Sequence, residues 1–200
     1  EFNPDIVLGF GGYVTYPVIK AAKKLGIKTF LHEQNSIVGK TNKFLSNKID
    51  LVAVSFLNTL NQFPKAKKVI YSGNPCGENA LTTKEIKKNS IGLEEKKKLV
   101  IVVAGSLGSS SMNEKLKTFL RLSKKGDYQV LYITGKKHYE DFIKGSRFGS
   151  NIKVVPYLDN LAGLMRNCDL IVTRAGASTM SEILALNLPA IFIPSPYAVS

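Results

Sequence analysis

The sequence predicts an α/β protein made of two domains, each built on a parallel sheet. Apolar runs typical of buried strands precede small-residue turns and helical patterns at 6–25 and again at 99–122. A polar and charged segment at 76–98 separates these two copies of one plan. Strands that alternate with helices form parallel, right-handed units, so each domain is expected to be Rossmann-like. We therefore expect domains at 1–75 and 76–200.

Hydrophobic periodicity predicts the elements of both domains. Short continuous apolar runs indicate buried strands, and apolar residues at three- and four-residue spacing indicate helices. The predicted strands are 6–8, 27–31, 51–54, 69–71, 99–103, 130–133, 152–155, 170–172 and 190–193. The predicted helices are about 14–25, 41–48, 82–90, 112–122 and 138–143, a short one that ends near residue 168, and one around 178–186.

The charge of the chain favours an anionic partner. Its 200 residues carry a formal net charge of +13, and lysines far outnumber arginines. Scattered lysines attract anions in general, so a phosphorylated substrate, an anionic membrane face and nucleic acid all fit. A solvated lysine surface without a dedicated partner is the plain alternative. No apolar run approaches the ~20 residues of a membrane span, and the N-terminus lacks the pattern of a signal peptide.

The two cysteines and the two ends of the chain give further expectations. Cys76 and Cys168 form no CxxC pair, which favours free thiols in a reducing compartment. A strand already begins at residue 6, and only seven residues follow the last predicted strand at 190–193. An open parallel sheet needs covering crossovers at such places. We therefore expect both domains to be truncated, in a piece of a longer protein.

The stretch at 173–182 predicts an anion-binding corner. An apolar strand leads into Arg174-Ala175-Gly176-Ala177-Ser178-Thr179, and a helical pattern follows. Loop N–H groups at a helix N-terminus favour anions. The carboxylate of Glu182 is suited to accept hydrogen bonds from a ribose diol, which indicates a nucleotide site. The alternative is that Ser178 only caps the helix and Glu182 only balances its dipole.

Two further segments lie at predicted strand ends, where open α/β sheets bind ligands. The turn with Gly9, Gly11 and Gly12 follows the first strand, and His32-Glu33-Gln34-Asn35 follows the second. The first segment lets backbone approach a phosphate or sugar. The second indicates a pocket edge, or else a hydrogen-bonded loop at a domain interface.

The segment after these residues invites two interpretations. Gly39-Lys40-Thr41 resembles a phosphate loop, but that motif needs a glycine at position 34, which is Gln. The helix at 41–48 mixes apolar Phe44 with basic Lys48, which suits contact with anionic lipid. An ordinary amphipathic surface helix is the alternative. His32 and His138 lie far apart and complete no metal-ligand spacing, and no Gly-x-Ser-x-Gly motif occurs.

Several of these segments, in this order, resemble the MurG family of bacterial N-acetylglucosaminyltransferases. The resemblance covers nearly all of the chain. It rests on Gly9-Phe10-Gly11-Gly12-Tyr13-Val14-Thr15, His32-Glu33-Gln34-Asn35 with Gly39 and Thr41-Asn42, Gly73-Asn74-Pro75, Gly105-Ser106 with Gly108, and Arg174-Ala175-Gly176-Ala177-Ser178-Thr179 with Ser181-Glu182.

The resemblance implies a two-domain glycosyltransferase of the GT-B type that acts as an inverting hexosyltransferase. It implies transfer of N-acetylglucosamine from UDP-N-acetylglucosamine to undecaprenyl-pyrophosphoryl-muramoylpentapeptide, the lipid-linked precursor of peptidoglycan, without a metal or cofactor. It further implies a peripheral position at the cytoplasmic face of the cell membrane, with residues 1–75 serving the acceptor and membrane side and 76–200 the donor.

The resemblance also implies roles for individual residues. Asn35 and Ser106 would contact the donor, and the backbone of Leu158 would contact its uracil. Gly11, Gly12 and Tyr13 would face the pyrophosphate of the acceptor, and Phe44 and Lys48 would lie at the membrane-facing patch. Ribose and phosphates would be held by Ala177, Ser178, Thr179, Met180, Ser181 and Glu182.

The chain departs from the family pattern at several positions. The glycine loop with the histidine that serves as general base would precede residue 1, and the Gln-rich donor segment would follow Ser200. Gly77 stands where the family has arginine, and Leu107 where glutamine is common. We therefore expect the 200-residue piece to be inactive. His32 is a weak substitute candidate for the base.

Two rival functions remain open. One is another UDP-sugar enzyme of the same fold, such as a lipid glycosyltransferase or a UDP-sugar 2-epimerase, which an acceptor screen would separate. The other is a basic module that binds nucleic acid. We do not expect nucleic acid as a partner, because the lysines scatter among helices and do not gather with aromatic residues.

Overall fold

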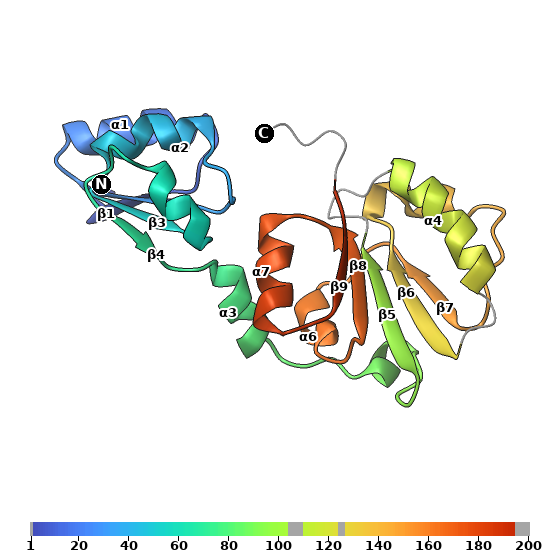
Figure 1. Cartoon of the computed structure of the whole chain (residues 1–200). Coiled ribbons are helices and arrows are strands. Elements are labelled where there is room, and N and C mark those ends of the chain that lie inside the picture. Colours follow the sequence, from blue (N-terminus) through green and yellow to red (C-terminus); the bar gives the residue numbers. More distant parts are fainter. Residues whose placement is uncertain (1, 104–109, 124–126, 195–200) are drawn as a thin grey trace. The chain divides into compact units, whose positions relative to one another are not determined.

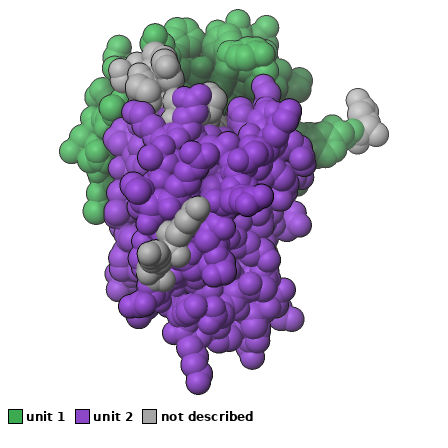
Figure 2. All heavy atoms as spheres, turned by 90° about the vertical axis from the view of Figure 1, so that its right-hand side faces the viewer, with its two compact units in different colours: residues 1–75, 200 green, residues 76–199 purple. Residues whose placement is uncertain are grey.

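The chain folds into two compact α/β units (Figure 1). The computed structural model describes residues 2–103, 110–123 and 127–194. Contacts along the backbone divide the chain into unit 1, residues 1–75, and unit 2, residues 76–199, which Figure 2 colours separately. Each unit has its own parallel sheet, as the sequence predicts, and its own hydrophobic core.

Unit 1 has a four-stranded sheet in the order β1-β2-β3-β4. Every neighbouring pair is parallel. The buried core residues are Ile19, Leu31, Leu45, Ile49, Val52, Val54 and Phe63. The elements are β1 (Ile6–Gly9), α1 (Thr15–Lys24), β2 (Lys28–Glu33), α2 (Lys40–Leu45), β3 (Leu51–Val54) and β4 (Val69–Tyr71), with 3-10 turns at Ser46–Lys48 and Leu57–Gln62.

Unit 2 has a five-stranded parallel sheet in the order β7-β6-β5-β8-β9. Its strands are β5 (Lys98–Val103), β6 (Tyr128–Ile133), β7 (Ile152–Val155), β8 (Leu170–Arg174) and β9 (Ala190–Ile193). Its helices are α3 (Pro75–Thr82), α4 (Ser110–Leu122), α5 (Tyr139–Ile143), α6 (Leu161–Met165) and α7 (Ala177–Ala185), with 3-10 turns at Lys88–Ile91 and Lys136–His138.

Helices cover both faces of the unit 2 sheet, because side chains alternate along each strand. On β5, Ile101 and Val103 belong to the core cluster that contains Leu164 of α6 and Ile183 of α7. Val102, between them, belongs to the cluster with residues of α4 and α5. Figure 1 shows α4 on one side of this sheet and α6 and α7 on the other.

The winding of unit 2 reverses at β5. Strands β6 and β7 add to one side of β5, whereas β8 and β9 add to the other. The pairing of β5 with β8 brings Val103 opposite Thr173 at the carboxyl end. At such a switch point the two flanking connections leave in opposite directions, and a crevice opens between them.

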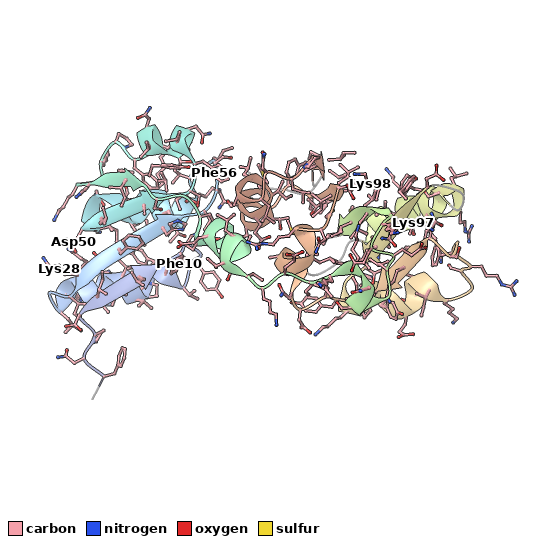
Figure 3. The ribbon with its side chains drawn as sticks, turned by 90° about the horizontal axis from the view of Figure 1, so that it is seen from below. Phe10, Lys28, Asp50, Phe56, Lys97 and Lys98 are labelled. Atoms are coloured by element: carbon pink, nitrogen blue, oxygen red, sulfur yellow. The ribbon has the colours of Figure 1, made fainter. Side chains whose placement is uncertain are left out.

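The same aspartate contact occurs at the amino end of each sheet. In unit 1, Asp50 lies just before β3 and accepts from the N–H of Thr29 at 2.9 Å and from Lys23 Nζ at 2.9 Å. In unit 2, Asp169 lies just before β8 and accepts from the N–H of Leu99 at 2.8 Å and from Lys98 Nζ at 2.7 Å. Figure 3 shows Asp50 near Lys28, with Phe10 and Phe56 toward the opposite end of the unit 1 sheet.

These contacts lower the pKa of both aspartates. Hydrogen bonds from Lys23 and Thr29 hold the pKa of Asp50 well below its ordinary value. Burial alone would raise the pKa of Asp169, but hydrogen bonds from Lys98 and the Leu99 N–H outweigh it and lower the net value. Both carboxylates therefore stay charged at neutral pH and fix the start of one strand against its neighbour.

Two sequence predictions about the elements were wrong. A helix at 82–90 is not formed: α3 ends at Thr82, and Ile86 instead donates its N–H to the Gly163 carbonyl at 3.0 Å. Helix α3 begins earlier, at Pro75, where the missing N–H of proline costs nothing. Strand β2 runs to Glu33, beyond the predicted end at 31, because buried hydrogen bonds satisfy the polar side chain of Glu33.

We predict that Asp50→Asn destabilises unit 1 by about 1–2 kcal/mol at pH 7. A carboxylate with a lowered folded pKa adds stability above its unfolded pKa of about 4, and this stability is lost as pH falls toward the folded pKa. The difference from the wild-type free energy of unfolding should therefore shrink in acid. Urea unfolding at pH 7 and pH 3 measures it, with exposed Asp5→Asn as the control. An equal difference at both pH values would contradict this role of Asp50.

Candidate functional site

A cavity opens at the carboxyl edge of the unit 2 sheet, beside the pairing of β5 with β8. Its volume is about 640 Å³, within the usual range for small-molecule sites. We call it the switch-point cavity. Val103, Ile133 and Arg174 line it from the ends of β5, β6 and β8. The other lining residues are Asn79, Thr83, Gly135, Tyr157, Leu158, Asp159, Asn160, Leu161, Ala162, Thr173, Gly176, Thr179 and Glu182.

Helix α7 forms one wall of the switch-point cavity. Thr179 and Glu182 of the predicted donor residues line it, together with Gly176 before the helix. Gly176 is the N-cap residue, in an extended conformation and without a side-chain cap. The alternative that Ser178 caps the helix is therefore wrong, because Ser178 already lies inside the first turn. Glu182 lies in the second turn.

The remaining predicted residues of α7 do not line the cavity. Ala177, Ser178, Met180 and Ser181 belong to the same helix but are not lining residues. The hydroxyl of Ser181 donates to the Ala177 carbonyl at 2.9 Å, so it is engaged within the helix. Ser106, predicted on the loop after β5, lies outside the described residues, as does Leu107.

Among the described residues that line the cavity, one side chain is cationic and two are acidic. Arg174 is the cationic lining residue, and Asp159 and Glu182 are the acidic ones. Burial raises the pKa of the Glu182 carboxyl above its ordinary value. A cavity lined by a partly desolvated carboxylate, a guanidinium and the residue that precedes a helix can bind a molecule that carries hydroxyl groups at one end and negative charge at the other.

The wall opposite α7 is the segment from Tyr157 to Ala162, which includes the predicted Leu158. Asn160 caps α6: its side chain accepts from the Gly163 N–H at 2.9 Å and donates to the Lys84 carbonyl at 3.0 Å. A Cβ on Gly163 would lie 2.3 Å from that carbonyl. Only glycine therefore allows residues 84–86 to pack against α6, and this contact supports the wall.

Gly77 explains one departure from the family pattern in physical terms. It is buried in α3, and a Cβ there would lie 3.2 Å from the Ser181 carbonyl and 3.4 Å from the Ala185 Cβ of α7. The small residue lets α3 approach α7 closely. Asn79 and Thr83, which follow it, line the switch-point cavity.

In unit 1, a buried carboxylate organises the segment after β2. Glu33 is 1% exposed. One carboxylate oxygen accepts from the Asn35 N–H at 2.9 Å and from Asn35 Nδ2 at 3.1 Å. The other accepts from the Gly39 N–H at 2.9 Å and from Asn42 Nδ2 at 2.8 Å. Four donors replace the water that burial removes, so Glu33 fixes the predicted donor contact Asn35.

The same network reaches the glycine turn after β1. A Cβ on Gly11 would lie 3.3 Å from the side-chain amide of Asn42. Gly11 and Gly12 have φ of +92° and +76°. Tyr13 is 85% exposed. The predicted acceptor residues thus lie beside the segment that carries Asn35, at the carboxyl edge of the unit 1 sheet.

His32 lies inside unit 1. The ring is 3% exposed, and its Nε2 lies 3.0 Å from the Gly73 carbonyl. Its Nδ1 is buried without a hydrogen-bond partner among the described residues. The ring also contacts Phe10 with a centroid distance of 5.9 Å. This geometry gives the base role of His32 no support, because neither nitrogen faces an open space.

Phe44 and Lys48 form a basic and apolar surface on unit 1. Phe44 is 62% exposed, and Lys48 Nζ lies 5.6 Å from its ring centroid. Both line a cavity of about 360 Å³. The rest of its lining is Lys43, Ser46, Asn47, Gln62, Pro64 and Lys65.

The described residues offer neither a metal-ligand cluster nor a membrane-spanning helix. Within them, His, Cys, Asp and Glu side chains nowhere gather in a group of three or more suited to hold a metal ion. No helix in the described part of the chain combines the length and apolar character that a membrane crossing requires.

Several residues of the switch-point cavity were not predicted from the sequence. Arg174 was part of a predicted motif but was given no role. It is the last residue of β8 and lines the cavity at the carboxyl edge of the sheet. Asn79, Thr83 and Gly135 were also missed. The signal for Gly135 was available, since it lies two residues after the end of a predicted strand. Asn79 and Thr83 carried no such signal. Asn79 lies in α3, where no helix was predicted, and Thr83 directly follows α3.

We predict that Glu33→Gln lowers the free energy of unfolding of unit 1 by about 2–3 kcal/mol, because an amide NH₂ would face N–H donors in a buried site. The same change should broaden or shift the amide signals of residues 34–42. Urea unfolding and NMR measure both effects, with Asp5→Asn as an exposed control. Unchanged stability together with unchanged signals at 34–42 would contradict the organising role of Glu33.

Comparison with known proteins agrees with this geometry. The model of the glycosyltransferase family 28 C-terminal domain matches residues 99–200, and that of the N-terminal domain matches residues 1–54. Two curated relatives are named UDP-N-acetylglucosamine–N-acetylmuramyl-(pentapeptide) pyrophosphoryl-undecaprenol N-acetylglucosamine transferase. The enzyme of Bacillus cereus is 42% identical and that of Bacillus licheniformis 43%, each over 204 aligned residues. The match covers 100% of this chain but 56% of each relative, so the chain spans about half their length.

Solved structures show the same relationship. The crystal structure of MurG from Acinetobacter baumannii matches with a TM-score of 0.71 and 32% identity, over 98% of this chain and 54% of that one. A UDP-N-acetylglucosamine 2-epimerase from Methanocaldococcus jannaschii has a TM-score of 0.63 at 16% identity, over 94% of this chain and 61% of that one, and therefore shares the fold alone. The family match over residues 99–200 and the two parallel-sheet units establish that the chain belongs to glycosyltransferase family 28.

Proposed function

We propose that this chain serves the transfer of N-acetylglucosamine from UDP-N-acetylglucosamine to undecaprenyl-pyrophosphoryl-muramoylpentapeptide. The observation that carries the proposal is the switch-point cavity, which Arg174 lines from the end of β8 and Glu182 lines from α7. The names of the curated relatives, which are similar along the whole of this chain, support the choice of substrates.

In this proposal unit 2 is the donor domain. Glu182 accepts hydrogen bonds from the two ribose hydroxyls, and Arg174 and the N–H groups at the start of α7 bind the diphosphate. The backbone of Leu158 contacts the uracil, and the loop with Ser106 contacts phosphate. Thr179 adds a hydroxyl inside the cavity. Ala177, Ser178, Met180 and Ser181 act through the helix backbone.

Unit 1 is the acceptor domain in this proposal. Gly11, Gly12 and Tyr13 contact the pyrophosphate of the lipid acceptor, and Asn35, held by Glu33, contacts the sugar of the donor. The exposed Phe44 and the lysines around it meet the anionic face of the membrane, which would make the protein peripheral, at the cytoplasmic side.

The proposed reaction is a displacement at the anomeric carbon of the donor. The 4-hydroxyl oxygen of the muramyl sugar forms a bond to that carbon on one face as the bond to the β-phosphate oxygen breaks on the other, so UDP leaves and the configuration inverts. A general base takes the hydroxyl proton. The growing charge on UDP is balanced by Arg174 and the N-terminus of α7.

We predict that Arg174→Gln weakens UDP binding about tenfold and leaves uridine binding unchanged, because the lost hydrogen bonds go to a charged group that uridine lacks. Amide-shift titration of the chain measures both affinities. In the wild type, the shifts should gather at 104–109 and 174–182. Arg166→Gln is the matched control, since Arg166 is exposed at the end of α6 and does not line the cavity. Wild-type chain that binds neither UDP nor UDP-N-acetylglucosamine would overturn the proposed function.

We predict that UDP affinity falls in mild acid, because Glu182 takes up a proton and loses the charged carboxylate that binds the ribose. The pKa of Glu182 is raised, so this loss begins at a higher pH than it would for an ordinary glutamate. Glu182→Gln should bind UDP weakly at neutral pH and remove this part of the pH profile. Titrations between pH 4 and pH 8 test it, with exposed Glu140→Gln as the control. An unchanged profile in Glu182→Gln would assign the ribose contact to another group.

The same raised pKa predicts a gain of stability in this variant. When the pKa of a carboxyl group is higher in the folded than in the unfolded state, the group stabilises the fold most at pH values below its unfolded pKa. This stabilisation is lost as the pH rises through the folded pKa. Glu182→Gln should therefore raise the free energy of unfolding at pH 7 and have little effect below pH 4. Urea unfolding measures this, and a destabilised variant at pH 7 would contradict it.

A further inference from the structure

One cation–π contact lies beside the switch-point cavity. Lys136 Nζ lies 4.7 Å from the centroid of the Tyr157 ring. Tyr157 is a wall residue of the cavity and is 44% exposed, whereas Lys136 is exposed and not a lining residue. An ammonium group within about 6 Å of an aromatic ring centroid attracts the ring electrostatically. The contact therefore restrains the Tyr157 ring at the cavity.

Strand pairing and hydrogen bonds hold the backbone around both residues. Strands β6 and β7 pair through Ile133 and Val155. Beyond that pair, Thr134, which is fully buried, donates its N–H to the Val155 carbonyl at 3.1 Å. Its hydroxyl donates to the same carbonyl at 3.4 Å. These bonds fasten the turn after β6 to the end of β7, two residues before Tyr157.

Gly135 then sets the direction of the chain toward Tyr157. Its φ of +86° and ψ of 140° lie in a region that glycine alone adopts readily. His138 donates its N–H to the Gly135 carbonyl at 3.1 Å, so the turn at Lys136–His138 closes directly behind it. The position of Lys136 over the ring is thus a product of the fold and not of a free side chain alone.

We infer that Lys136 is a positioning residue for the nucleotide: it holds the Tyr157 ring as a flat wall for the base without contacting the phosphates itself. This inference rests on the proposed function of the switch-point cavity. The chemistry fits a planar, aromatic ligand group, because an aromatic ring fixed in one plane offers a stacking or edge contact at low entropic cost. Arg174 lies at the end of β8, on the other side of β5 from β6 and β7, and binds the charged part of the ligand.

The test compares uridine with UDP as probes. Lys136→Gln should weaken the binding of both by the same factor, about two- to fivefold for an exposed cation–π contact. Lys136→Arg, which keeps a cation over the ring, should retain wild-type affinity. Lys137→Gln is the matched control, since Lys137 is the adjacent exposed lysine and has the same charge. Amide-shift titration of each variant supplies the affinities.

A double-mutant cycle with Tyr157→Leu isolates the contact. After the ring is removed, Lys136→Gln should have no further effect on either ligand. Loss of UDP affinity alone, with uridine unchanged, would overturn the inference and assign Lys136 a direct phosphate contact. Equal affinity of Lys136→Gln and wild type for both ligands would also overturn it. Neither result would touch the proposed function, which fails only if wild-type chain binds no UDP.

Discussion

The switch-point cavity depends on the direct pairing of β5 with β8. Because the chain adds strands to one side of β5 and then to the other, no connection crosses the carboxyl end of this pair. The crevice left there is lined by Val103 and Arg174, which are the last residues of the two strands. The helix that leaves β8 then points its unpaired N–H groups at the same space. The pairing of β5 with β8 thus creates the crevice and places Arg174 and the N-terminus of α7 beside it.

Sequence pattern predicted this arrangement well where burial follows periodicity. All nine strands of the described part of the chain were expected in their places, because buried parallel strands appear as mostly apolar runs. Glu182 and Thr179 were predicted for the site from the strand–loop–helix pattern around them, and both line the cavity. The family resemblance supplied Leu158, which no pattern of apolar residues could have indicated.

The predictions failed where a polar residue is buried or where a distant segment decides the local structure. His32 and Glu33 extend β2 although both are polar. The amides of Asn35, Gly39 and Asn42 satisfy the Glu33 carboxylate, and Nε2 of His32 contacts the Gly73 carbonyl. Residues 84–86 are held by α6, which lies some 75 residues further along the chain. Local helix propensity carries no information about such distant partners, so the prediction of a helix at 82–90 was wrong.

The bond between Lys84 and α6 uses the carbonyl of residue 84 and not its side chain. The contact therefore requires a glycine at 163, because only a hydrogen atom fits beside that oxygen, and it requires the side-chain amide of Asn160. Residue 84 can therefore change its charge or size while the contact persists, whereas any side chain at residue 163 would collide with the Lys84 carbonyl. The support of this cavity wall thus depends on the backbone of one partner and on the absence of a side chain in the other.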